Sequence, residues 1–201
     1  MLPLHNPAKT RLLYSFFQDL SSSYSRFFRD FKYYLCYTYC GDIMFRELTR
    51  KNKQISNEKC IEILKSERRG VLSVNTENGY PYGMPMNHYY CDKTNKIYFH
   101  CGKTGHRLDC LKQNNKASFC VYTKGAKKEN DWALDVESVI VFGEINIIEN
   151  KEMVKKITTK ISRKFTNDED YIDNEIKNYL NATLLLELIP LHICGKAVTE
   201  S

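Results

Sequence analysis

Short apolar runs joined by turn residues most constrain the fold of this chain. The segments "VLSVN" (71–75), "KIYFHC" (96–101) and "ASFCVY" (117–122) have strand-like patterns, and "ESVIVFGEINII" (137–148) is the longest such run. Asn78-Gly79 and "DKTN" supply turns, and Asn-Gly tolerates the positive φ of two-residue hairpins. The regular alternation of strand and helix found in doubly wound parallel sheets is missing. We therefore expect a mainly β fold, an antiparallel sheet closed into a small barrel with short helices packed outside.

The helices are marked by their capping residues. Ser56 is a good N-cap, and the helix that it begins is expected to end at Gly70, with Arg68 and Arg69 in its last turn. The remaining elements expected are a helix that ends near Asn114-Asn115, amphipathic helices near 150–165 and 168–180, a strand over 183–190 and a final segment over 191–198.

Residues 1–43 differ from the rest of the chain. They are dense in Phe, Tyr and Ser and show no helical or strand period. We expect a poorly structured N-terminal extension here, and an aromatic partner-binding arm is the alternative. Residues 44–201 are expected to form one domain, because a chain of 201 residues that is 42% hydrophobic can bury a real core.

Charge and cysteine content exclude several classes of protein. The net charge of +6 comes from 30 basic and 24 acidic residues that are interspersed, which argues against a nucleic-acid-binding protein. The eight cysteines include no Cys-x-x-Cys pair, and we find neither a signal peptide nor an apolar run of about 20 residues. The expectation is a cytoplasmic protein with reduced thiols and no membrane attachment.

The segment "GKTGHR" has the composition of an anion site. If Gly105 and His106 open a helix, the free N–H groups of its first turn favour an anion. Lys103, His106 and Arg107 add charge, and a guanidinium binds a phosphate through two parallel hydrogen bonds. A polar turn with a helix cap is the alternative interpretation.

The segment "GYPYGMPMNHYY" contains two prolines, which cannot donate to a ladder. The strand is therefore expected at a sheet edge or at a bulge. Its unpaired backbone groups near Met86 and Asn87 could then bind the polar edge of a planar ring. An edge protected by proline against aggregation is the alternative.

Other chemistries fit the sequence poorly. Cys91, His100 and Cys101 do not make a metal site, because adjacent strand residues point to opposite faces. The chain has no Gly-x-Ser-x-Gly elbow, no Gly-rich nucleotide motif and no His-Glu-x-x-His spacing. Hydride chemistry on a bound flavin would need no acid–base pair, because the cofactor supplies it.

The order of several segments resembles that of a known family. "RRGVLSV", "NGYPYGMPMNHYY", "KIYFHCGKTGHRLDCLKQNNKASFCVY", "ESVIVFGEI" and "HICGK" are similar to segments of the pyridoxamine-phosphate-oxidase-like FMN-binding split barrels, closest to the nitroimidazole-resistance (Nim-type) branch. The resemblance covers residues 44–200. It implies an antiparallel split barrel that forms a homodimer, with FMN in a cleft at the dimer interface.

The resemblance also implies site residues. His106 and Arg107 fall where the oxidases carry the Arg-Lys pair that holds the FMN phosphate, and Ser138 replaces a glutamine that contacts the ring. His100 matches a histidine beside the cofactor and is the expected catalytic residue; a strand-end histidine satisfied by a neighbour is the alternative. The full set of cofactor-binding residues expected is Met84, Pro85, Met86, Asn87, His100, Cys101, Lys103, His106, Arg107 and Ser138.

Two departures narrow the expected activity. The oxidases have an arginine and a lysine on the flavin-lining strand, where this chain has Met84 and Tyr89, and the C-terminal segment lacks their Arg-rich signature. Pyridoxamine phosphate oxidation is therefore not expected. The expected function is an FMN-dependent reductase that takes electrons from NAD(P)H and passes them to a small planar acceptor such as a nitroaromatic. A non-catalytic flavin- or haem-binding protein on the same barrel is the alternative.

Overall fold

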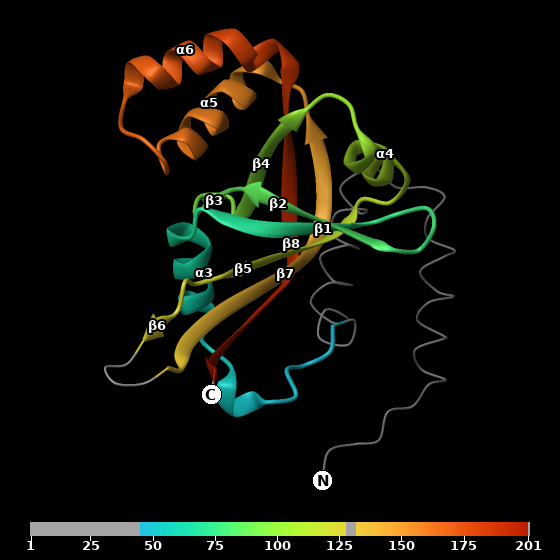
Figure 1. Cartoon of the computed structure of the whole chain (residues 1–201). Helices are drawn as coiled ribbons and strands as arrows, with labels where there is room; N and C mark the ends of the chain where they lie inside the picture. The colour runs from blue at the N-terminus through green and yellow to red at the C-terminus, as the bar shows by residue number, and fades with distance from the viewer. Residues whose placement is uncertain (1–44, 128–131, 201) are drawn as a thin grey trace, which may run out of the picture. The chain divides into compact units, whose positions relative to one another are not determined.

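One antiparallel sheet contains all the strands of the described chain (Figure 1). The computed structural model describes residues 45–127 and 132–200, so the extension expected over 1–43 lies outside it. The strands are β1 (Arg69–Asn75), β2 (Pro81–Asn87), β3 (Tyr89–Cys91), β4 (Lys96–Gly102), β5 (Lys116–Tyr122), β6 (Ala126–Lys127), β7 (Leu134–Ile148) and β8 (Thr183–Glu200). The helices are α3 (Asn57–Ser66), α4 (His106–Gln113), α5 (Lys151–Ser162) and α6 (Glu169–Tyr179), with 3₁₀ turns η2 (Lys51–Lys53) and η3 (Leu180–Ala182).

The order of the strands makes the sheet curl. The order is β2-β1-β5-β7-β8-β4-β3, so β2 and β3 are its two edges, yet His88 alone separates them in the chain. The edges must therefore meet at His88, and the sheet forms a half-barrel. No ladder joins β2 to β4 among the described strands, although the two approach each other. We call this open line between β2 and β4 the seam. The expected split barrel with helices outside is confirmed.

Two hydrophobic cores use the two faces of the same strands. The larger core fills the half-barrel and includes Phe99 and Phe119, with α3 contributing Ile63 and Leu64. The smaller core lies on the other face of β4 and β8, where α5 covers Tyr98 and Leu185. Figure 1 shows α5 and α6 at this end of the sheet. Both faces of β8 are buried here, which is why its first residues read as a continuous apolar run.

The edge position expected for the proline-containing strand is confirmed. In β2, Pro81 pairs with Asn75 and Pro85 with Val71, and the opposite side of β2 has no strand partner among the described residues. On the side of β2 that has no partner strand, a proline loses no ladder hydrogen bond by lacking an N–H.

The expectation of two separate C-terminal segments is wrong. Residues 183–200 form the single strand β8, which pairs with β7 over residues 185–200, and only a bulge between Phe142 and Gly143 interrupts the register. Pro190 faces Gly143 at this bulge, where the regular ladder is already broken. A Cβ on Gly143 would lie 2.2 Å from the carbonyl oxygen of Ile189, so glycine is required for this close approach.

The helix expected to end at Gly70 ends four residues earlier. Ser56 caps α3 as expected by accepting a hydrogen bond from the Lys59 N–H at 3.2 Å, but α3 ends at Ser66 and Gly70 belongs to β1. Gly70 is needed for packing rather than for a cap, because a Cβ there would lie 2.5 Å from the Phe119 ring.

The two-residue turn expected at Asn78-Gly79 is also wrong. Five residues, 76–80, join β1 to β2, and of the pair only Gly79 has a positive φ, of +83°. The Asn78 side chain instead accepts a hydrogen bond from the Tyr80 N–H at 3.2 Å, which stabilises the longer loop.

Three further expectations concern thiols, metals and membranes. The described cysteines are Cys60, Cys91, Cys101, Cys110, Cys120 and Cys194, and all are free thiols. Over residues 45–127 and 132–200, no group of His, Cys, Asp and Glu side chains is arranged to hold a metal ion. None of the helices in these ranges is long and apolar enough to cross a membrane.

Candidate functional site

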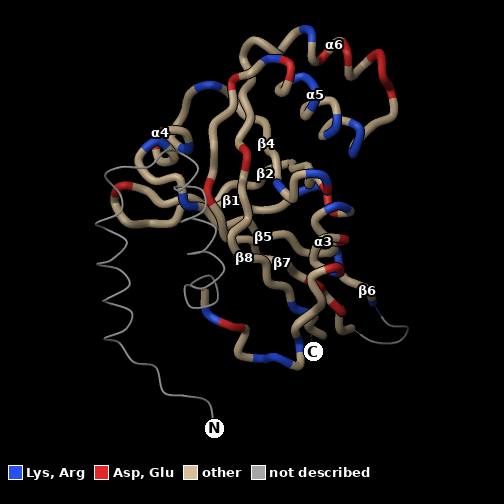
Figure 2. The backbone as a smooth tube through the Cα atoms, turned by 180° about the vertical axis from the view of Figure 1, so that it is seen from behind, with Lys and Arg blue, Asp and Glu red and all other residues tan. Residues whose placement is uncertain are grey.

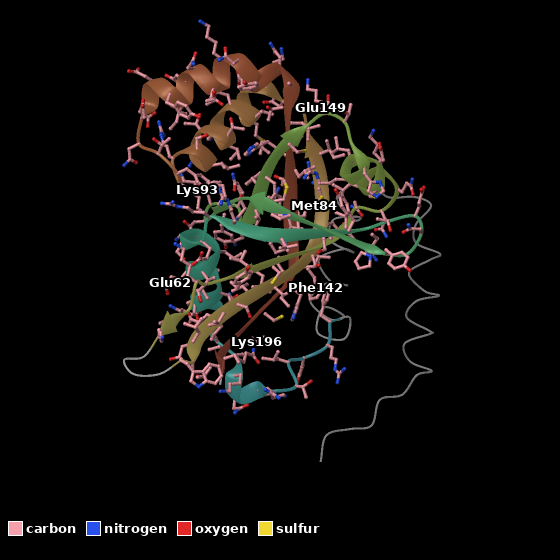
Figure 3. All side chains as sticks on the ribbon, in the orientation of Figure 1. Glu62, Met84, Lys93, Phe142, Glu149 and Lys196 are labelled. Atoms are coloured by element: carbon pink, nitrogen blue, oxygen red, sulfur yellow. The ribbon has the colours of Figure 1, made fainter. Side chains whose placement is uncertain are left out.

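The seam brings three elements of the predicted site together. The outer edge of β2 lies on one side, the end of β4 lies on the other, and α4 follows β4 directly. β3 pairs with β4 only over residues 96–98, so the β4 backbone from Phe99 onward has no strand partner on its seam side among the described residues. Two edges with unpaired backbone groups therefore face each other, and Met84, labelled in Figure 3, marks the β2 side.

Arg107 of α4 reaches across the seam to β2. Its Nη1 atom lies 2.8 Å from the Met86 sulfur and 3.8 Å from the Met84 sulfur. Thioether sulfur is a weak acceptor, so these contacts do not replace the hydration that a guanidinium loses. Met84 and Met86 are two residues apart on one strand, so both point into the half-barrel toward Arg107.

The guanidinium of Arg107 has no anionic partner within the described part of the chain. Its Nε atom is buried without a hydrogen-bond partner, and no carboxylate of these residues forms an ion pair with it. Burial raises the pKa of the Cys101 thiol, while the charge of Arg107 and a hydrogen bond with it act in the opposite direction. Arg107 is therefore a fixed positive charge with unused donors.

α4 begins at His106, the position that the anion-site prediction assumes. Gly105 is the N-cap residue and has a φ of +124°, a conformation that favours glycine. His106 is exposed, and its ring centroid lies 5.0 Å from that of Tyr82 on β2. Lys103 is exposed in the loop that precedes Gly105. The three basic residues are thus gathered at the end of the seam.

His100 points to the opposite face of β4 from Cys101. It lines a cavity of about 430 Å³ whose other walls include Val154 and Thr158 of α5, and Ile176 and Tyr179 of α6. The imidazole keeps an exposed surface but has protein on several sides. This partial burial, and secondarily the charge of Arg107, lower the pKa of His100, which favours the neutral imidazole.

The other predicted residues lie farther from Arg107. Pro85 and Asn87 alternate with the methionines on β2 and point away from the half-barrel, and the side-chain Oδ1 of Asn87 accepts a hydrogen bond from Arg69 Nε at 3.0 Å. Ser138 lies on β7, three strands from β2, which corresponds to about 14 Å across the sheet. One chain therefore does not bring Ser138 to the seam.

Sequence reasoning missed Tyr82 and the residues of the His100 cavity. Tyr82 precedes Met84 by two positions, so the strand period could have placed it on the same face. The α5 and α6 residues gave no local signal, because their position above β4 depends on packing between distant parts of the chain.

The sequence also matches a family profile. Residues 56–197 match the profile of the family described as pyridoxamine 5'-phosphate oxidase. No curated protein sequence matches the chain.

Solved structures of the same fold are distant in sequence. A conserved hypothetical protein from Mycobacterium tuberculosis is 15% identical with a TM-score of 0.63, and the match covers 75% of this chain and 90% of that chain. A candidate 5-nitroimidazole antibiotic resistance protein from Bacteroides thetaiotaomicron is 19% identical with a TM-score of 0.60, covering 78% and 98%. A flavocytochrome from Azotobacter vinelandii is 13% identical with a TM-score of 0.63, covering 79% and 75%. The half-barrel and the profile match over residues 56–197 together show that the chain belongs to the pyridoxamine 5'-phosphate oxidase family of split-barrel proteins.

Proposed function

We propose that the protein is an FMN-dependent reductase, with FMN bound along the seam. The observation that carries this proposal is Arg107, a guanidinium whose buried Nε has no hydrogen-bond partner and which forms no ion pair with the described residues. A phosphate monoester carries close to two negative charges and would complete this site. Arg107, His106 and Lys103 would hold the phosphate at the end of the seam.

The flavin ring would lie between the two unpaired edges. The backbone N–H and C=O groups of 84–87 on β2, and those of His100 and Cys101 on β4, would bind its polar edge. Bound FMN supplies the hydride and electron transfer, and the chain supplies binding and orientation. Met84 and Met86 exclude water beneath the site, because both side chains are buried.

The reductant in this proposal is NAD(P)H, and the acceptor is a small planar molecule such as a nitroaromatic. The cavity beside His100 has a volume of about 430 Å³, within the range of ligand pockets. A neutral imidazole can both donate and accept a hydrogen bond, so His100 could orient an acceptor there. The similarity to the Bacteroides protein named for 5-nitroimidazole resistance supports this acceptor class.

A homodimer is part of the same proposal. Val71, Cys120, Ile140 and Cys194 form one row across four strands and are only half-buried, although their neighbours on the inner face are fully buried. A second copy packing on this row would complete their burial. Ser138 lies on the same face and would then approach the seam of the second copy.

Light scattering tests the dimer. The expected mass is twice that of the 23.6 kDa chain, and Ile140→Glu should give monomers because it places a charge in the row. Tyr171→Glu, at an exposed position on α6, is the matched control and should leave the mass unchanged. A monomer that retains stoichiometric FMN would contradict the dimer and leave the flavin proposal standing.

Flavin affinity tests the seam. Arg107→Ala should weaken FMN binding by about 10- to 150-fold, because charge-assisted hydrogen bonds are worth about 1.5–3 kcal/mol each. Lys112→Ala, on the same helix but paired with Asp109 at 3.8 Å, should change the affinity less than twofold. Riboflavin, which lacks the phosphate, should bind the wild type and Arg107→Ala equally. An FMN affinity within twofold of wild type for Arg107→Ala would overturn the site.

A non-catalytic flavin or haem binder is the second candidate function. The similarity to the flavocytochrome from Azotobacter vinelandii favours it. Anaerobic absorbance spectra separate the two candidates. Flavin absorbance that NADH or NADPH bleaches supports the reductase, whereas a Soret band, or bound flavin inert to both nucleotides, supports the binder.

A further inference from the structure

A second group of cations lies where α3 leads into β1. The guanidinium carbons of Arg68 and Arg69 lie 5.6 and 5.5 Å from the ring centroid of Phe165, just beyond the end of α5. Lys164 precedes Phe165, and its ammonium donates to the Glu67 carbonyl oxygen. We call Arg68, Arg69 and Lys164 the basic cluster. Figure 2 shows the basic segments of α5 and of the connection from α3 to β1 close together.

The cluster is held in place by neutral groups. Phe165 contacts both guanidinium groups, and the side-chain Oδ1 of Asn87 accepts a hydrogen bond from Arg69 Nε at 3.0 Å. The ring and these hydrogen bonds restrict three flexible side chains before any ligand arrives. Such preorganisation lowers the entropy that binding costs.

Carboxylates near the cluster are engaged by other cations. Lys65 pairs with Asp92 at 2.9 Å, and Arg163, next to Lys164, pairs with Glu169 at 2.7 Å. Within the described residues no ion pair involves a member of the basic cluster. Asp92 and Glu169 are therefore paired with other cations, and the carboxylate that acts on the cluster is that of Glu67, which influences Lys164 without forming an ion pair.

The ammonium of Lys164 is a charged group that its partly buried position disfavours. Burial lowers the pKa of Lys164 to about 8. The Glu67 carboxylate raises this pKa and the charge of Arg68 lowers it, and the effect of Glu67 is the larger of the two. The charge of Lys164 also contributes, after burial, to the lowered pKa of His88. An anion placed between the guanidinium groups and the ammonium would stabilise the charged form of Lys164.

We propose that Arg68, Arg69 and Lys164 bind the phosphate group of a small phosphorylated molecule. Guanidinium groups match phosphate oxygens in charge and geometry. Asp92 and Glu169 flank the cluster and would repel a long polyanion, so the site fits one phosphate or diphosphate group. It shares no residue with the proposed FMN phosphate site and does not depend on it.

Titration of the full chain with inorganic pyrophosphate at low salt, followed by calorimetry, tests the proposal. Wild type should bind one pyrophosphate per chain at this site. The double variant Arg68→Gln/Arg69→Gln changes only exposed side chains, and it should weaken binding by about 10- to 100-fold. Arg163→Gln removes a neighbouring cation that is already paired, and it should change the affinity less than twofold.

A lysine NMR titration gives a second readout. Saturating pyrophosphate should raise the pKa of Lys164 from about 8, because a bound anion stabilises the ammonium form. Three results would overturn the proposal: no binding to wild type at about 5 mM pyrophosphate, an equal loss in Arg163→Gln and the double variant, or an unchanged Lys164 pKa.

Discussion

Glu187 and Arg107 are both charged side chains that lie against the hydrophobic cores, but they differ in their hydrogen-bond partners. Glu187 on β8 is 6% exposed, and its carboxylate accepts from Tyr98 Oη at 2.9 Å, Lys96 Nζ at 3.0 Å and Asn146 Nδ2 at 3.2 Å. Arg107 has a buried Nε with no hydrogen-bond partner and two methionine sulfurs as neighbours. The first arrangement stabilises the fold by itself. The second is incomplete without a ligand, which is typical of a binding site.

The pKa of Glu187 reflects this complete network. Burial alone would raise it, but hydrogen bonds from Lys96, Asn146 and Tyr98 outweigh burial, and the pKa is lowered. Tyr98 responds in the other direction, since burial raises its pKa to about 12. The tyrosine therefore remains a hydrogen-bond donor to the carboxylate throughout the physiological range.

Removing the Glu187 carboxylate should have the largest effect on stability. Glu187→Ala leaves three donors without their acceptor and should lower the free energy of unfolding by about 3 kcal/mol. Urea denaturation at pH 7 measures this loss, and Glu187→Gln, which keeps an acceptor oxygen, should lose less than half as much. Because the folded pKa is lowered, the wild-type stabilisation is present above pH 4.5 and lost below it, whereas Glu187→Gln should lack this dependence. Equal losses for both variants would show that the network contributes little.

His88 is intermediate between Glu187 and Arg107, because only one of its ring nitrogens has a hydrogen-bond partner, and it should have the next largest effect on the free energy of unfolding. It is fully buried; its Nε2 lies 2.8 Å from the Leu64 carbonyl oxygen, and its Nδ1 has no hydrogen-bond partner. Burial first, and Lys164 second, lower its pKa from 6.5 to about 3. Below pH 6.5, His88 is therefore protonated in the unfolded chain but stays neutral in the folded chain. The free energy of unfolding should fall by about 2 kcal/mol between pH 6.5 and pH 5.

The control for this acid sensitivity is His88→Gln, which can still donate to Leu64 and does not titrate. Its unfolding free energy should fall much less between pH 6.5 and pH 5 than that of the wild type, with the remaining fall coming from the smaller lowering of the His100 pKa. An unchanged slope in this variant would assign the acid sensitivity to another group.

Arg107→Met should have the smallest effect and the opposite sign. In the flavin-free protein it removes a buried unpaired donor and should raise the free energy of unfolding by about 1 kcal/mol. With saturating FMN the order should reverse, because only the wild type gains the phosphate contact. Urea denaturation with and without FMN measures both. A loss of stability in the flavin-free variant would mean that the sulfur contacts hold the seam together.

Much of the fold was predictable because its strands carry local signals. Alternation located the strands, and the prolines of β2 correctly indicated an edge. The true role of Gly70 could not be read locally, because it depends on the Phe119 ring, which lies on a strand nearly fifty residues away. The continuity of β8 through Pro190 depends likewise on the bulge opposite Gly143.

The candidate site was predictable in part for the same reason. The two-residue period correctly separates His100 from Cys101 and brings Met84 and Met86 to one face. That Arg107 reaches these sulfurs depends on the curl of the whole sheet, which no local pattern encodes. Whether the assembled residues bind FMN stays a prediction.

The position of β8 in the sheet also determines when the strands can pair during protein synthesis. β8 lies between two groups of strands, β2-β1-β5-β7 on one side and β4-β3 on the other, yet its residues, 183–200, are translated after all of them. Until they emerge from the ribosome, the edges of β7 and β4 stay unpaired, and the two groups are linked by the chain but by no ladder. The nascent protein must therefore carry two exposed strand edges from the completion of β7 until β8 emerges, a state in which chaperone binding or aggregation competes with folding.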